Sequence, residues 1–160
     1  MNIFVLDENP YLAAQYHNNK HVVKMILETA QLLSTAHHVL DGEGCQIKDL
    51  IYKKTHTNHP CAKWVRESDM NYWWTYNLLR CLLQEYTFRY GKVHATSRIL
   101  DTLFKNPRNI HYGPMTTHPQ CMPDDCKSDD IVKSYRNYYI KYKNSTAQWK
   151  NRNTPDWYKI

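Results

Sequence analysis

The clearest pattern in the sequence is a helical repeat of polar positions between His17 and Thr35. At 3.6 residues per turn these polar side chains fall on one narrow line, and apolar residues border that line on both sides. An amphipathic helix on a protein surface has a broader polar face, so we expect a helix that is buried almost all round. The line comprises His17, His21, Lys24, Glu28, Gln31 and Thr35, and the opposite arc comprises Val22, Val23, Ile26, Leu27, Ala30 and Leu33.

The same periodicity continues along the chain and predicts helices without a clear strand. Capping residues, first-turn prolines and glycine-containing turns mark the helix boundaries. The expected helices cover residues 10–40 with a break near 18–19, 61–90, 94–104, and 131–143 behind Ser128, Asp129 and Asp130, whereas 46–54 is at most a short helix and 107–127 is a loop with four prolines. We therefore predict an all-α fold, a compact single-domain bundle of long helices over residues 1–160.

The net charge of +6 is concentrated at the C-terminal end of the chain. The basic segment 131–160 carries Lys and Arg residues at seven positions, opposed by Asp156 alone. Tyrosines and tryptophans alternate with these cations, which suits a nucleic acid because cations pair with phosphates and flat rings stack on unpaired bases at about 1–3 kcal/mol per base. An alternative is a helix whose tyrosines pack inward. The predicted phosphate-binding residues are Lys133, Arg136, Lys141, Lys143, Lys150, Arg152 and Lys159.

The polar line of the first helix is the best candidate for chemistry. Two imidazoles, an ammonium and a carboxylate in a buried setting have to pair with one another, with water or with a ligand, and such clusters are suited to proton transfer and amine chemistry. The plainer alternative is a solvated stripe in which Lys24 and Glu28 form an ordinary ion pair one turn apart. A helix of this kind makes Glu28 and Lys24 the first residues to test.

The sequence gives little support for a disulfide framework, a secreted or membrane location, or a metal or phosphate-loop site. The five cysteines form no paired framework, there is no signal peptide and no apolar stretch long enough to span a membrane. We therefore expect free thiols and a cytoplasmic protein, in a host cytoplasm if a phage encodes it. No HExxH, CxxC or glycine-rich phosphate loop is present, so neither a metal nor another cofactor is expected.

Four short motifs together resemble a known family. The stretch LAAQYH at 12–17 precedes the polar helix, and His59-Pro60 opens the second helix, which ends Glu85…Arg89-Tyr90-Gly91. The chain closes with Pro155-Asp156-Trp157-Tyr158-Lys159. This layout, which covers nearly the whole chain, is similar to that of the pyrimidine-dimer DNA glycosylase/AP lyase family of phages and bacteria.

The resemblance implies an enzyme that flips a damaged or modified pyrimidine nucleotide out of duplex DNA. A free amine then attacks C1′ and forms an imine that leads to strand cleavage. In the phage member this is the N-terminal amine exposed by removal of Met, whereas here Asn2 is bulky and Met1 is expected to remain. The amine is therefore that of Met1 or of Lys24, and the catalytic glutamate of the family maps to Glu28.

The remaining candidate residues take supporting roles in this hypothesis. His17 and His21 join Glu28, Lys24 and Met1 in the catalytic set. The residues expected to hold the flipped nucleotide are Gln31, Lys20, His56, His59, Arg89, Trp157 and Tyr158. Ile3 stands where the family has an arginine, which argues against an identical lesion specificity.

Three alternatives remain open from the sequence. The polar line is richer in ionisable groups than a lyase needs, which also fits a phage enzyme that modifies pyrimidines in DNA on a glycosylase-like scaffold. A non-catalytic nucleic-acid-binding protein predicts salt-dependent binding that survives loss of Lys24 and Glu28. A structural protein with a buried polar network predicts that the same changes mainly lower stability.

Overall fold

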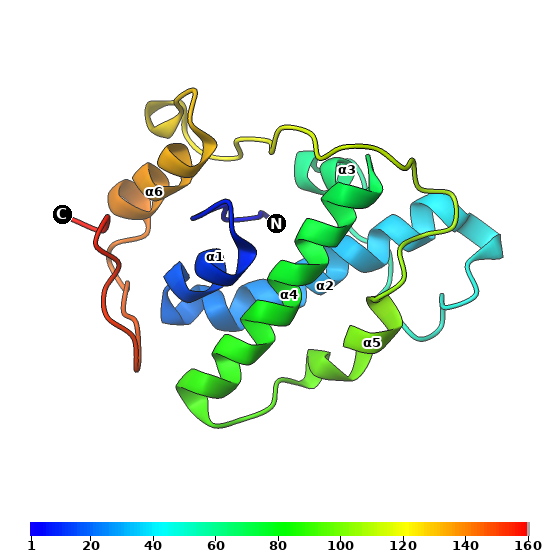
Figure 1. The fold of residues 1–160 in the computed structure, drawn as a ribbon, viewed down its shortest axis with the longest axis horizontal. Coiled ribbons are helices and arrows are strands. Elements are labelled where there is room, and N and C mark those ends of the chain that lie inside the picture. The colour runs from blue at the N-terminus through cyan, green and yellow to red at the C-terminus, as the bar shows by residue number, and fades with distance from the viewer. Residues whose placement is uncertain (160) are drawn as a thin grey trace.

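Two long helices, α2 (Asn19–Asp41) and α4 (Asp69–Tyr90), cross at the centre of the computed structural model, which describes residues 1–159 (Figure 1). The shorter helix α1 (Pro10–Tyr16) packs on α4, and α3 (Pro60–Val65) packs on α2. The other elements of the described chain are α5 (Leu100–Leu103), α6 (Ile131–Tyr142) and three 3-10 helices at Gly42–Gly44, Ala95–Ile99 and Asp124–Cys126. No strand occurs within residues 1–159, so the predicted all-α fold is confirmed.

The expected break in the first long helix separates α1 from α2. His17 lies between the two helices with an extended backbone, and the side chain of Asn18 caps α2 by accepting the His21 N–H at 2.9 Å. The end of α2 also follows the prediction, because Gly42 adopts a φ of 53° that favours glycine. His17 therefore does not share a continuous helix with Glu28, and the predicted polar line begins at His21.

The prediction of one continuous helix over residues 61–90 is wrong. The first turns of this range form α3, and a break at residues 66–68 separates them from α4. Ser68 has an extended backbone and caps α4 by accepting the Asn71 N–H at 3.2 Å, while the Asp69 N–H bonds to the His111 carbonyl at 2.9 Å. Polar side chains that bond to nearby backbone groups stop a helix in this way. Gly91 ends α4 in the left-handed conformation, as predicted.

The smaller predictions elsewhere in the chain have mixed outcomes. Residues 94–104 contain only a 3-10 helix and one α-helical turn, and 46–54 forms turns without a helix. The predicted loop 107–127 is a loop apart from the 3-10 turn at its end. The N-cap of α6 is Asp130, which accepts the Lys133 N–H at 3.2 Å, while Ser128 bonds to the Asp130 backbone.

The N-terminal segment is part of the core. Ile3, Phe4, Val5 and Leu6 are all buried, and the Phe4 ring packs against aromatic residues of α6. Figure 1 shows the N-terminus between α6 and the crossing of α2 and α4. Burying four consecutive apolar residues fixes the path of the chain and therefore the place of Met1.

The C-terminal segment covers the junction of α1 and α2. The Asn19 N–H bonds to the Gln148 carbonyl at 2.8 Å, and the Trp149 indole N–H bonds to the Tyr16 carbonyl at 2.9 Å. In Figure 1 this segment runs beside α6 at the edge of the molecule. Over residues 1–159, no helix has the length and apolar character that crossing a bilayer requires.

Candidate active site

An amine and a carboxylate from distant parts of the chain meet at the N-terminus. The α-amino nitrogen of Met1 lies 3.3 Å from Oε1 of Glu28, and the Glu28 side chain is only 12% exposed. Lys24 Nζ lies 3.8 Å from the other oxygen of Glu28, but its side chain is 63% exposed. Both amines considered as nucleophiles therefore contact the same carboxylate, and the side chain is buried for Met1 but exposed for Lys24.

Asn2 holds the N-terminus in this place. Its side-chain amide donates to the Cys121 carbonyl at 2.8 Å, and its oxygen accepts hydrogen bonds from the Ile3 N–H at 2.8 Å and the Tyr135 hydroxyl at 3.1 Å. These contacts tie Met1 to the loop before α6 and to α6 itself. Sequence reasoning treated Asn2 only as a bulky residue and missed its anchoring role, because its partners are far away in sequence.

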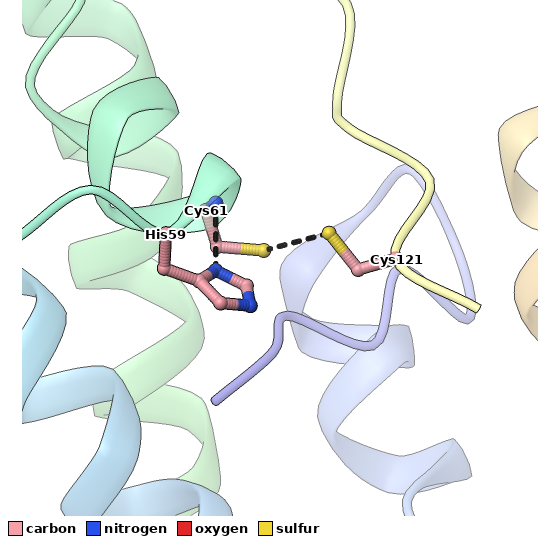
Figure 2. Close-up of side chains that lie close together, drawn as sticks. All are labelled: His59, Cys61 and Cys121. Carbon is pink, nitrogen blue, oxygen red and sulfur yellow. Dashed lines mark hydrogen bonds between the residues drawn. The ribbon is translucent and has the colours of Figure 1, made fainter. Parts of the chain in front are cut away.

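His59, Cys61 and Cys121 lie close to the same terminus (Figure 2). His59 Nδ1 accepts the Cys61 backbone N–H at 3.0 Å and so caps α3. The Sγ atoms of Cys61 and Cys121 are 3.8 Å apart, and Cys61 Sγ lies 3.7 Å from the Asn2 side-chain oxygen. The Met1 ammonium and Glu28 are both near enough to act on the His59 pKa, which places this predicted residue beside the amine–carboxylate pair.

The electrostatics of this cluster follow from burial and from the thiol contact. Burial and, next, the nearby Met1 ammonium lower the pKa of His59. The hydrogen bond between the two thiols raises the pKa of Cys61 and lowers that of Cys121 to about 7. Near neutral pH the cluster therefore holds a neutral imidazole and one readily ionised thiol. Neither cysteine was singled out by the sequence, since only the fold brings them together.

His17 and His21 lie in the core, away from this carboxylate. His17 Nδ1 bonds to the Ala13 carbonyl at 2.6 Å, and His21 Nδ1 bonds to the Tyr139 hydroxyl at 2.7 Å. The His21 ring also stacks on Phe4 with centroids 4.3 Å apart. Burial lowers the pKa of His17 to about 4 and of His21 to about 3. Both rings are thus neutral packing groups of the fold.

The expectation that the helix with the polar line is buried almost all round is wrong, because one side of α2 is exposed. Val23 and Leu27 are each 41% exposed, so this side of the helix faces solvent. Lys20 and Lys24 are exposed beside them, and Gln31 is half-buried one turn further on. These residues form an exposed α2 face with two cations and two apolar side chains, next to Glu28.

Arg89 belongs to a buried ion-pair network elsewhere. Its guanidinium lies 3.5 Å from Glu85, which is 3% exposed, and also donates to the Gln15 carbonyl at 2.9 Å. Arg152 donates to Glu85 at 2.9 Å, and this hydrogen bond raises the Arg152 pKa. Both arginines therefore join neighbouring segments to α4 through the single Glu85 carboxylate that they share.

The C-terminal aromatic residues pack on α1, on α6 and on one another. Trp157 contacts Tyr16 and Tyr139, with the Arg136 guanidinium 5.2 Å from its ring centre. Tyr158 packs on Trp149 at a centroid distance of 4.8 Å. Both were predicted to approach the flipped nucleotide, but the structure does not bring them to Met1 or Glu28.

The remaining predicted phosphate ligands fall into two groups. Arg136 bonds to the Leu6 carbonyl and to Asp7, and Lys141 bonds to the Asp125 carbonyl. In the second group, the Lys143 ammonium lies over the Tyr138 ring and that of Lys150 over the Tyr90 ring. Lys133 and Lys159 are exposed to solvent. His56 is also exposed, with a φ of 48° and a hydrogen bond to the Thr55 hydroxyl.

A cavity of about 500 Å³ lies between the loop 107–127 and the start of α6. Trp74 and His118 line it together with Glu8, Asp129 and Asp130, and neither Met1 nor Glu28 does. Three carboxylates make this cavity unsuitable for DNA phosphates. The amine–carboxylate pair therefore remains the best candidate for a site that acts on DNA.

Comparison with known proteins identifies a family for the part of the chain that holds this pair. The family model described as pyrimidine dimer DNA glycosylase matches residues 1–98, which include Met1, Lys24, Glu28 and His59. Cys121 and the basic C-terminal segment lie outside the match. No curated protein and no solved structure matches the chain.

Proposed function

Because the chain belongs to the pyrimidine dimer DNA glycosylase family, we propose that it excises a damaged or modified pyrimidine and then cleaves the abasic strand. The observation that carries this proposal is the 3.3 Å contact between the Met1 α-amine and Glu28. A nucleophilic amine next to a sheltered carboxylate is the arrangement that imine-forming base excision requires. DNA is accordingly the substrate, with the target nucleotide flipped out of the duplex.

The pair divides the chemistry between its two members. Glu28 accepts a proton from the Met1 ammonium, and the freed nitrogen lone pair attacks C1′ while the bond from C1′ to the base breaks. The base leaves with the bonding electrons and takes up a proton, and the carboxylate stabilises the positive charge that develops on the sugar. Opening of the sugar ring then gives the imine, loss of a C2′ proton expels the 3′ phosphate, and water releases the amine.

Distance and anchoring favour the Met1 amine over that of Lys24 as the nucleophile. Lys24 is largely exposed and its nitrogen lies further from the carboxylate, at 3.8 Å against 3.3 Å. The terminus is also held by the hydrogen bonds of Asn2, and a positioned nucleophile reacts faster than a mobile one. Lys24 is then better placed, with Lys20, to bind phosphates flanking the target nucleotide.

Borohydride trapping tests the proposal directly. Labelled duplexes that carry a cyclobutane dimer or an abasic site are mixed with the protein, a form acetylated only at the α-amino group, and Lys24→Ala. Intact mass confirms in each case that the chain begins at Met1. We expect a covalent adduct with the unmodified protein and with Lys24→Ala, and none with the acetylated form.

The other outcomes separate the alternatives. An adduct that is lost only in Lys24→Ala would move the nucleophile to that lysine. No adduct on either duplex, with DNA still bound at low salt, would overturn the glycosylase proposal in favour of a base-modifying enzyme or a binding protein.

A further inference from the structure

We propose that His59, Cys61 and Cys121 form a binding site for a thiophilic divalent cation of the zinc class, adjoining the N-terminus. The site lies next to the amine–carboxylate pair but does not depend on the glycosylase proposal. Its residues come from the start of α3 and from the loop before α6, so the cation would bridge two segments that are far apart in sequence (Figure 2).

The distances between the donor atoms fit a tetrahedral metal site. One ligand atom from each of the three residues lies within 4.8 Å of the other two. The two Sγ atoms are 3.8 Å apart, and two thiolates bound to one zinc at about 2.3 Å in tetrahedral geometry are separated by roughly 3.8 Å. The sulfurs therefore need no change in separation to share a cation.

The chemistry of the donors selects the class of cation. Two sulfurs and an imidazole favour zinc and similar borderline or soft ions over magnesium or calcium, which prefer oxygen. Both thiols bind as thiolates, so uptake of one cation releases up to two protons. His59 uses one ring nitrogen, and ligation through Nδ1 exchanges the hydrogen bond from the Cys61 N–H for a bond to the metal.

The fold holds the donors in place before any cation arrives. His59 and Cys61 are fixed by the first turn of α3, where Pro60 starts the helix. Cys121 is held on both sides of its backbone, since its carbonyl accepts from Asn2 at 2.8 Å and its N–H donates to the Tyr135 hydroxyl at 3.3 Å. Three protein ligands leave a fourth position open, as in zinc sites that also take water or a substrate group.

A disulfide between the two cysteines is the rival explanation for their approach. A disulfide needs only the two sulfurs, whereas here a histidine ring lies within reach of both. The third donor is what favours a cation. The two possibilities make different predictions, because oxidation of the thiols destroys a metal site.

Titration of the reduced, full-length protein tests the site. Zinc is added in competition with a chromophoric chelator, and cobalt(II) is used in parallel because thiolate ligation gives it a ligand-to-metal charge-transfer band. The variants are Cys121→Ser and His59→Asn, in which asparagine can still cap α3. Cys126→Ser is the matched control, since Cys126 lies near the same loop but outside the cluster.

We expect one equivalent of metal in the unmodified protein and in Cys126→Ser, with a thiolate band for cobalt. Loss of an outer-shell partner costs roughly 10–100-fold in metal affinity, and we expect loss of the ligands in Cys121→Ser and His59→Asn to cost at least that much. If the reduced protein binds no metal, the proposal is overturned. Equal affinity in Cys121→Ser also overturns it, as does a disulfide between Cys61 and Cys121 that persists in the presence of both reductant and zinc.

Discussion

The α-amino nitrogen of Met1 lies 3.3 Å from Glu28 Oε1, so the first residue of the chain contacts the middle of α2. This contact depends on two features that act together. Residues 3–6 are buried in the core, and Asn2 is hydrogen-bonded to Cys121 and Tyr135. A change in either the carboxylate or the anchor is therefore expected to alter activity without removing the helices that carry them.

Replacement of Glu28 by Gln should abolish most of the base excision and leave the fold intact. A positioned acid–base group contributes about 10²–10⁴-fold to the rate, and glutamine keeps the shape of the side chain but cannot take a proton from Met1. Single-turnover base release on a dimer-containing duplex measures the effect. Glu43→Gln is the control, because Glu43 is fully exposed; an equal loss there, or none in Glu28→Gln, would remove the assigned role.

Asn2→Asp should misplace the nucleophile. Aspartate has the size of asparagine, so Met1 is expected to remain, but it cannot donate to the Cys121 carbonyl and its charge faces that oxygen instead. An unsatisfied buried hydrogen-bonding group costs about 1–3 kcal/mol. We expect a lower rate of adduct formation with little change in DNA affinity. If both fall equally, Asn2 acts on binding rather than on the position of the amine.

Glu85→Ala should lower the free energy of unfolding strongly. It leaves the buried guanidinium of Arg89 without its carboxylate and also removes the partner of Arg152. Breaking a buried ion pair from one side costs about 3–5 kcal/mol. Denaturant unfolding measures the change. The exposed pair of Lys48 and Glu43 provides the comparison, since Glu43→Ala is expected to change stability by less than about 1 kcal/mol.

Stability should fall as the pH is lowered from about 6.5 to about 4. Burial lowers the pKa values of His17, His37 and His118 to about 4 and that of His21 to about 3. In this window the unfolded chain binds protons that the folded chain excludes, so unfolding becomes easier as the pH falls. Each buried ring contributes up to about 1.4 kcal/mol per pH unit between its two pKa values, and above pH 7 the contribution is complete.

Urea unfolding at several pH values measures this slope. His118→Phe is the matched variant, because His118 stacks on Trp64 at 4.0 Å and phenylalanine can keep that contact. The variant should lose stability less steeply on acidification than the unmodified protein does. An unchanged slope would mean that folding does not lower the pKa of His118.

DNA binding should depend more on the exposed α2 face than on the partnered cations of the C-terminal segment. Lys20 has no ion pair within residues 1–159, whereas Lys141 is close to Asp125. Each phosphate contact adds roughly 0.9 to the slope of log affinity against log salt. Lys20→Ala should therefore reduce the slope by about that amount and Lys141→Ala by less. Equal slopes for the two variants would contradict a role for the α2 face.

Local structure could be predicted from the sequence where short-range signals are strong. Helical periodicity, Asn18 beside the break, Gly42 and Gly91 gave the extents of α2 and the end of α4, because caps and glycine conformations depend on neighbouring residues. The sequence missed the break at Ser68 and the shortness of the helix after His94. Both depend on side chains or distant backbone that compete for the hydrogen bonds of a helix.

The same division applies to the candidate site. The sequence identified Met1, Lys24 and Glu28 through a resemblance and a helical pattern, but it grouped them with His17 and His21, which the fold places in the core. It treated Asn2 only as a bulky residue and gave no reason to consider Cys61 or Cys121. Their proximity depends on long-range packing of the N-terminal segment and of the loop before α6. Such contacts become visible in the folded chain alone, because periodicity reports which face of a helix is apolar and not which segment covers it.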